Sequence, residues 1–154
     1  MKTFNLSGEK LSKNALQIHL VGTLDELNAY LGLVKVRTQD NKEKKFLETM
    51  QINLMRLMSH VSDISNKEYF FTEKDTAVLK ERINSLKEIH SGLSELVVPG
   101  KNETDAFIHI ARTAARKAER YYTAVNEQTP LCKYAASYLN KVSNYLFYLS
   151  HGIE

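Results

Sequence analysis

The chain has 154 residues, of which 43% are hydrophobic and 25% charged, a composition typical of one globular domain that buries its own core. Its net charge of +3 is modest, and no basic region interleaved with aromatic residues accompanies it, so nucleic acid binding is not expected. We therefore treat residues 1–154 as a single domain.

Three features indicate the cytoplasm. Cys132 is the single cysteine, which excludes an internal disulfide and favours a reducing compartment. No apolar stretch approaches the ~20 residues that span a bilayer, so no membrane association is expected. The residues from Met1 to Leu6 lack the apolar segment of a secretory signal.

Apolar residues recur at three- and four-residue steps along most of the chain, which is the spacing of one face of an α-helix. The stripes cover residues 16–31, 47–64, 79–89, 107–125 and 135–153. No segment shows sustained strand alternation. We therefore expect an all-α fold, a five-helix up-and-down bundle with short connections.

Two of the expected helices have candidate N-terminal caps. Thr72 or Asp75 can cap the third helix, because both side chains accept hydrogen bonds from backbone amides at a helix start. Asn102 is the candidate cap of the fourth helix, which follows Pro99 and Gly100.

The fifth expected helix carries a second stripe beside its aliphatic one. A helix that is apolar on two sides requires two packing partners. Either this helix is central to the bundle or it also faces another subunit, and its spacing favours neither. The second stripe consists of Tyr134, Tyr138, Tyr145 and Tyr148.

The fourth expected helix carries a line of cations, which we call the basic ridge. Arg112, Arg116 and Arg120 stand at four-residue intervals, with Lys117 beside them, so their guanidinium groups lie along one face. Such a line attracts a polyphosphate or facing carboxylates. For an arbitrary helix, a solvated face neutralised by Glu119 and nearby acids is the more common outcome.

No standard metal or nucleotide motif accompanies the basic ridge. The histidines show no ligand spacing with one another or with a carboxylate, so no metal site is predicted and they are expected at the surface or at helix ends. Glycine-rich nucleotide loops are also absent from the sequence. The histidines are His19, His60, His90, His109 and His151.

Three ordered segments match one known pattern. Residues 22–32 resemble a Gly-Thr-Val-Asp-Glu-Leu-Asn motif, and residues 138–147 resemble a Tyr-Leu-Asn-Arg-Leu-Ser segment. Between them, Pro99 and Gly100 precede residues 109–120, which resemble a His-x-Ala-Arg and Arg-Arg-Ala-Glu-Arg signature. All three belong to the PduO-type ATP:cob(I)alamin adenosyltransferase family, which this chain resembles from Gly8 to about Val36 and from Leu96 to the C-terminus.

The resemblance implies a reaction and its substrates. The family transfers the 5′-deoxyadenosyl group of ATP, with Mg²⁺, to the cobalt of cob(I)alamin and releases triphosphate. The cobalt supplies the nucleophile, so the protein aligns the substrates and stabilises charge. The resemblance also implies a homotrimer with its sites between subunits.

The resemblance assigns roles to individual residues. Asp25 and Arg112 match a pair that joins two subunits next to the site, and together with Arg116 they are the expected catalytic residues. Leu96 matches the position that presses on the corrinoid. The residues matched to ATP binding are Lys13, Arg116, Lys117, Glu119, Arg120 and Asn140.

The sequence departs from the family at several of these positions. An ungapped alignment predicts that the chain starts after the family's Thr-Gly-Asp-x-Gly loop, which wraps the ATP phosphates. Leu96 replaces an aromatic residue, and Lys117 replaces an arginine and so lacks its bidentate fork. Together these changes predict a divergent member with weakened ATP binding.

Two alternatives to a weakened adenosyltransferase remain open. The chain can be a non-catalytic protein that keeps the bundle and holds a corrinoid without ATP-dependent transfer. It can also be a regulatory subunit that assembles with an active paralogue. The missing loop and Leu96 motivate both alternatives, whereas the retained residues of the basic ridge favour the enzyme.

Overall fold

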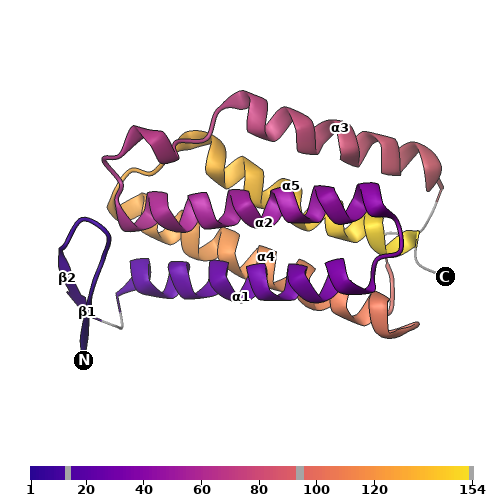
Figure 1. The fold of residues 1–154 in the computed structure, drawn as a ribbon, viewed down its shortest axis with the longest axis horizontal. Helices are drawn as coiled ribbons and strands as arrows, with labels where there is room; N and C mark the ends of the chain where they lie inside the picture. Colours follow the sequence, from indigo (N-terminus) through magenta and orange to yellow (C-terminus); the bar gives the residue numbers. More distant parts are fainter. Residues whose placement is uncertain (13–14, 93–95, 153–154) are drawn as a thin grey trace.

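Five long helices account for the apolar stripes of the sequence. The computed structural model describes residues 1–12, 15–92 and 96–152. Successive helices run in opposite directions (Figure 1), so the predicted all-α up-and-down bundle is confirmed. The helices are α1 (Leu16–Arg37), α2 (Asn41–Ser62), α3 (Glu73–Ile89), α4 (Glu103–Gln128) and α5 (Lys133–His151), and a 3₁₀ turn η1 (Lys67–Tyr69) precedes α3.

The predicted stripes form the core. Leu20, Leu24, Leu27 and Leu31 of α1 have no exposed surface, and the alanines of the α4 stripe are buried beneath them. Helix α1 packs on α2 and α4, and the small side chains of α4 permit close approach of its backbone. One expectation is wrong, because Ile89, the last residue of α3, is 68% exposed.

Helix α5 has two packing partners within the chain. It lies between α4 and α3, and its tyrosine stripe is buried at Tyr138 and Tyr145 and half-buried at Tyr134 and Tyr148. Helix α5 therefore takes the central position that was one of the two alternatives, and contacts within the chain alone bury its second stripe in part. The same position brings α5 alongside the three arginines of the basic ridge.

The two helices for which the sequence offered candidate caps, α3 and α4, are capped by the named residues. Thr72 is the N-cap of α3, and the Asp75 carboxylate accepts a hydrogen bond from the Thr72 amide at 2.7 Å, so both named candidates take part. The Asn102 side chain accepts from the Asp105 amide at 2.9 Å at the start of α4. Asp40 caps α2 in the same way, at 2.7 Å from the Lys42 amide.

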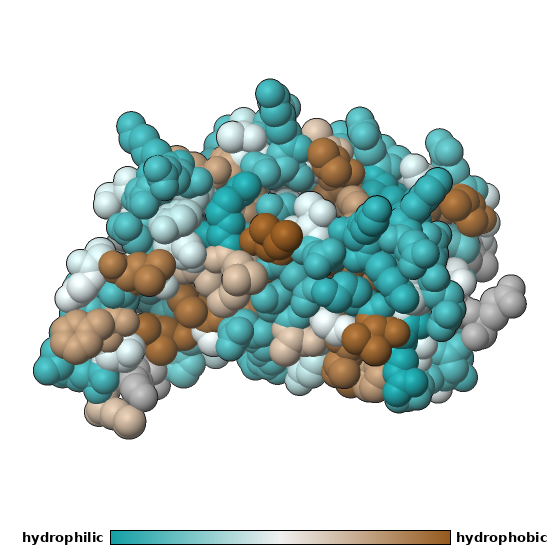
Figure 2. All heavy atoms as spheres, viewed as in Figure 1, coloured by the Kyte–Doolittle hydropathy of each residue, from teal (hydrophilic) through white to brown (hydrophobic). Residues whose placement is uncertain are grey.

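A small hairpin precedes the bundle and was not predicted. Strands β1 (Lys2–Phe4) and β2 (Lys10–Ser12) pair antiparallel, with Thr3 opposite Leu11. Three residues are too few to show alternation in a sequence. The hairpin leaves Phe4 67% exposed, and Figure 2 shows apolar side chains gathered at this end of the molecule. No described helix is long and apolar enough to cross a membrane.

Candidate functional site

The basic ridge borders two pockets on the side of α4 that faces α5. The first pocket has a volume of about 330 Å³ and is lined by Lys87, Arg112, Arg116, Ser143, Asn144, Phe147 and Tyr148. The second has a volume of about 440 Å³ and is lined by Arg116, Glu119, Arg120, Thr123 and Asn140. Arg116 lines both pockets, so the two form one continuous candidate site.

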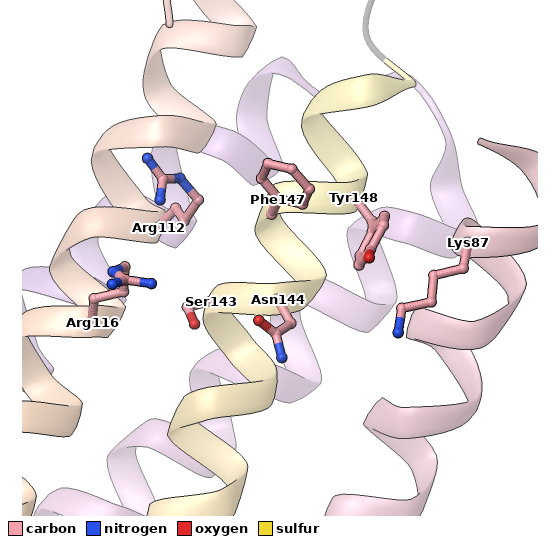
Figure 3. Close-up of a pocket in the computed structure, with 7 residues that line it drawn as sticks. All are labelled: Lys87, Arg112, Arg116, Ser143, Asn144, Phe147 and Tyr148. Carbon is pink, nitrogen blue, oxygen red and sulfur yellow. The ribbon is translucent and has the colours of Figure 1, made fainter. Parts of the chain in front are cut away.

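The first pocket is lined by cations from two helices and by the aromatic side chains of Phe147 and Tyr148 of α5 (Figure 3). Arg112 and Arg116 enter from α4, and Lys87 enters from α3 with its ammonium 5.4 Å from the ring centre of Tyr148. Burial and, less strongly, the charge of Arg116 lower the pKa of Arg112. Such a cluster favours an anionic ligand, because the positive charges are not neutralised within the pocket.

The second pocket combines cations with one carboxylate and one amide. Glu119 accepts a hydrogen bond from the Asn140 side chain at 3.2 Å, and Asn140 accepts one from Asn144 at 3.3 Å. Arg116, Arg120 and Asn140 are exposed, so their donors are available to a ligand. A single carboxylate beside cations suits Mg²⁺ that is held mainly by substrate phosphates and water, so Glu119 fits that ion.

Not all predicted site residues gather here. Lys117 lies one position round the helix and pairs with Glu26 of α1 at 3.2 Å, so it lines neither pocket. Asp25 is exposed on α1, and within the described part of the chain no ion pair joins it to Arg112. Leu96 is 91% exposed. Lys13 lies outside the described residues.

Sequence reasoning missed two kinds of residue. Lys87 has no motif around it and reaches the first pocket only because α3 packs beside α5. The histidines were expected at the surface or at helix ends, and His60, although fully buried, does lie in the last turn of α2. His109 contradicts the expectation, because it lies inside α4 and is only 4% exposed. The position of His109 three residues before Arg112 was the available signal, since that spacing places both on one face.

Comparison with known proteins gives this site a context. The cobalamin adenosyltransferase family matches residues 2–152, so the chain belongs to this family, as the three sequence segments indicated. It is 30% identical over 147 residues to a corrinoid adenosyltransferase of Bacillus subtilis, covering 92% of this chain and 76% of that protein. It is 27% identical over 150 residues to the corrinoid adenosyltransferase PduO of Citrobacter freundii, covering 95% of this chain and 45% of that protein.

Solved structures agree with the fold. A variant of a PduO-type ATP:corrinoid adenosyltransferase from Lactobacillus reuteri, complexed with cobalamin and ATP, superposes with a TM-score of 0.88 at 23% identity. The superposition covers 97% of this chain and 86% of that one. At this identity the likeness establishes the shared helical bundle.

The family match also includes the N-terminal hairpin, so it extends further than the ungapped alignment predicted. Within residues 1–12, no Thr-Gly-Asp-x-Gly sequence occurs. The turn of the hairpin uses its own donors, because the amides of Asn5, Gly8 and Glu9 all donate to groups inside the turn. These amides are therefore not available to wrap phosphates.

Proposed function

We propose that this chain transfers the 5′-deoxyadenosyl group of ATP to the cobalt of cob(I)alamin. The observation that carries the proposal is the second pocket, where Arg116, Arg120 and Asn140 converge beside Glu119. Membership of the cobalamin adenosyltransferase family, and relatives named corrinoid adenosyltransferases, support the choice of substrates.

The proposed chemistry is one substitution at carbon. The cobalt–carbon bond forms as the bond between the 5′ carbon and the triphosphate oxygen breaks, and triphosphate leaves with its added negative charge. Arg116 and Arg120 stabilise that charge, because preorganised cations cost little reorganisation during the reaction. Asn140 and Glu119 orient the nucleotide, and Mg²⁺, when bound, neutralises phosphate charge.

The remaining assignments are proposals about assembly. Asp25 is exposed, and Arg112, which lines the first pocket, is only partly buried, so each can reach a partner in another subunit. We assign them to an ion pair across the interface of a homotrimer. Lys13 is proposed to contact ATP and Leu96 the corrinoid, and Lys117 supports the site from its pair with Glu26. The cytoplasm is the proposed location, on the lone cysteine.

A second function has one specific observation in its favour. The amides of the hairpin turn are satisfied within the turn, which removes donors that would otherwise bind phosphate. A protein with this turn can hold a corrinoid without transferring an adenosyl group. The same observation suits a regulatory subunit that pairs with an active paralogue.

Product analysis separates these functions. The protein is mixed anaerobically with cob(I)alamin and Mg-ATP, and adenosylcobalamin and triphosphate are quantified by chromatography. Transfer predicts the two products in equal amounts. Corrinoid retained after desalting, without either product, would support the binding protein instead.

A further inference from the structure

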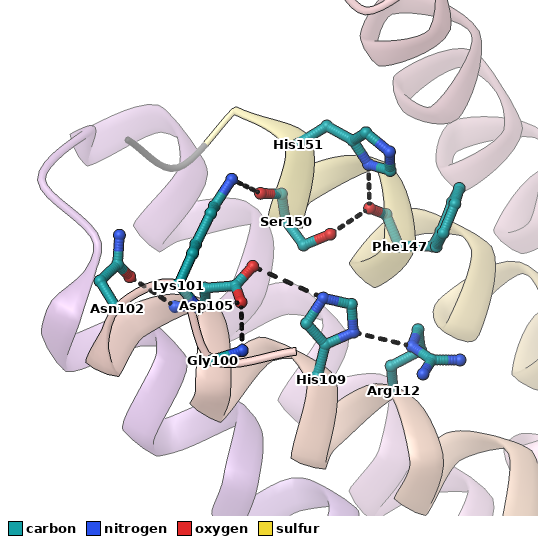
Figure 4. Close-up of polar contacts among 9 residues, drawn as sticks. All are labelled: Gly100, Lys101, Asn102, Asp105, His109, Arg112, Phe147, Ser150 and His151. Atoms are coloured by element: carbon teal, nitrogen blue, oxygen red, sulfur yellow. Dashed lines mark hydrogen bonds and ion pairs between the residues drawn. The ribbon is translucent and has the colours of Figure 1, made fainter. Parts of the chain in front are cut away.

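A buried series of polar contacts runs along one face of α4 and ends at Arg112 (Figure 4). His109 accepts a hydrogen bond at Nδ1 from Arg112 Nε, at 3.1 Å. On its other side, His109 Nε2 lies 3.5 Å from Asp105 Oδ1. The residues are spaced by four and three positions, so all lie on the same face of the helix. Asp105 is 2% exposed and His109 is 4% exposed, so the contacts between them are shielded from water.

The contacts define which ring nitrogen carries the proton. Because Nδ1 accepts from Arg112, the proton of neutral His109 must lie on Nε2, where it faces the Asp105 carboxylate. Burial lowers the pKa of His109, opposed by Asp105 and reinforced by Arg112, His151 and Lys101. A second proton would place an N–H against the Arg112 N–H, so the neutral ring is the state that fits.

The Asp105 carboxylate, at the other end of this series of contacts, also holds the turn before α4. Asp105 Oδ2 accepts from the amides of Gly100 at 2.7 Å and Lys101 at 3.2 Å. Gly100 has φ +98°, which favours glycine, and the Lys101 ammonium donates to the Ser150 carbonyl of α5 at 2.9 Å. The carboxylate therefore has one fixed orientation, and its Oδ1 can only face His109.

The contact with His109 restricts Arg112 in a specific way. The Nε–H is the only guanidinium donor that His109 uses, so the two terminal nitrogens remain for a partner. An arginine anchored at Nε loses much of the rotational freedom of its long side chain before any ligand arrives. Figure 3 shows the guanidinium of Arg112 held at the side of the first pocket, beside Arg116.

We propose that His109 is a positioning residue that aims Arg112 into the site, and that Asp105 sets the tautomer of His109 for that purpose. The proposal rests on the proposed function, because Arg112 has a catalytic role only if adenosyl transfer takes place. His109 itself contacts neither substrate. Since Asp105 also holds the turn that follows Leu96, the turn and the arginine share one anchor.

Two conservative substitutions separate positioning from simple packing. His109→Asn places a carbonyl oxygen near the position of Nδ1 and loses the contact with Asp105. His109→Gln places an amide near Nε2 and loses the acceptor for Arg112. Positioning predicts that H109Q lowers kcat about tenfold or more, with a smaller change in the KM for ATP, whereas H109N recovers most of the rate. If only the contact with Asp105 matters, H109Q will have a higher kcat than H109N, and that result would overturn the proposal.

A double-substitution cycle tests the role of Asp105. Asp105→Asn can present an amide N–H to Nε2 and so favour the wrong tautomer of His109, and it should lower kcat about tenfold. The asparagine of H109N has no tautomer to set, so adding D105N to H109N should cost at most about twofold. Equal losses in both backgrounds would show that Asp105 acts only on the turn. Thermal melts of each variant verify that the fold persists.

A spectroscopic measurement tests the geometry without turnover. In ¹⁵N-labelled protein near neutral pH, the His109 ring should show a protonated Nε2 and an unprotonated Nδ1 that accepts a hydrogen bond. D105N should shift this ring toward the other tautomer. A wild-type ring protonated at Nδ1 would overturn the proposal even if the protein is active. If the expected tautomer is found and no adenosyl transfer occurs, the proposed function fails and the positioning geometry stands.

Discussion

At the scale of single residues, the carboxylate of Glu43 is a buried charge that links three helices. It is 5% exposed, contacts the Tyr145 hydroxyl and the Arg82 guanidinium, and so ties α2 to both α5 and α3. Burial and the adjacent Glu43 raise the pKa of Tyr145 well above its ordinary value, so the phenol stays protonated. Arg82 is the only cation of this group, and Glu43 depends on it for neutralisation.

Replacing Arg82 by alanine should therefore lower the free energy of unfolding by about 2–3 kcal/mol, because it leaves a buried carboxylate beside a phenol. The matched control is Arg37→Ala, which breaks an exposed pair with Glu103 and should cost at most about 1 kcal/mol. Denaturant unfolding monitored by circular dichroism measures both. Equal losses in the two variants would contradict this account of the buried pair.

His60 predicts a loss of stability in acid. Burial lowers its pKa below 6.5, and its Nε2 accepts from the Cys132 amide at 2.9 Å, so the folded state requires a neutral ring. The unfolded state binds the proton more readily, so the stabilising contribution is complete above pH 6.5 and is lost as the pH falls. Burial also lowers the pKa of His90 and of His109, and these rings act in the same direction.

The free energy of unfolding should consequently decrease as the pH falls from about 7.5 to about 5.5. His60→Gln retains an acceptor for the Cys132 amide but cannot take up a proton, so this variant should show a weaker pH dependence. Denaturant unfolding at several pH values measures both slopes. A slope unchanged by the substitution would exclude His60 as a source of the effect.

Residue identities on the ridge were predictable because helical spacing alone aligned Arg112, Arg116 and Arg120. The burial of His60 was not, because an isolated histidine has no pattern that distinguishes a core position from a surface one. For His109, the three-residue spacing to Arg112 indicated a shared face but not that the histidine is buried. The contact of Lys87 with the first pocket depends on the packing of α3 against α5, which no local spacing encodes.

At the scale of elements, the helix starts offer a clean test of local structure. Asp40 accepts hydrogen bonds from the amides of Lys42 and Glu43 at the start of α2 and lies away from both ridge pockets. Asp40→Ala should lower the free energy of unfolding by about 1 kcal/mol, because the first amides of α2 lose their acceptor. Asp40→Asn keeps the acceptor and should retain most of the stability. Thermal unfolding of the pair decides whether the cap or the charge matters.

The long elements were predictable and the short ones were not. The leucines of α1 repeat over several turns, so their stripe predicted a buried face correctly. The hairpin of β1 and β2 has strands of three residues, joined by a turn in which the Asn5 side chain accepts a hydrogen bond from the Glu9 amide. Such a turn follows from side-chain hydrogen bonds that periodicity does not detect.

At the scale of the whole molecule, the proposed trimer predicts that Asp25 forms an ion pair with Arg112 of another subunit. An exposed carboxylate on α1 and a partly buried Arg112 on α4 have no ion pair with each other within the described residues. If they pair between subunits, Asp25→Arg places like charges together and should weaken assembly by at least about tenfold in the dissociation constant. The exchanged variant D25R/R112D should assemble more strongly than D25R. Analytical ultracentrifugation measures both, and a wild-type monomer would refute the interface.

The fold and family of the whole molecule could be predicted because three motifs and five stripes agreed with one architecture. The arrangement of the site could not, since two pockets depend on how α3, α4 and α5 pack together. Motif spacing indicated Lys117 as a ridge residue, but the helical turn directs it to Glu26 instead.

The central claim is that the ridge pockets of α4 serve ATP although residues 1–12 contain no Thr-Gly-Asp-x-Gly sequence. The most direct measurement is the ATP-dependent loss of cob(I)alamin absorbance under anaerobic conditions, for wild-type protein, Arg116→Ala and the distant control Arg37→Ala. We predict turnover by wild type and by R37A, and a rate lower by roughly tenfold to a hundredfold in R116A. No ATP-dependent loss with wild-type protein, or equal rates for wild type and R116A, would contradict the claim.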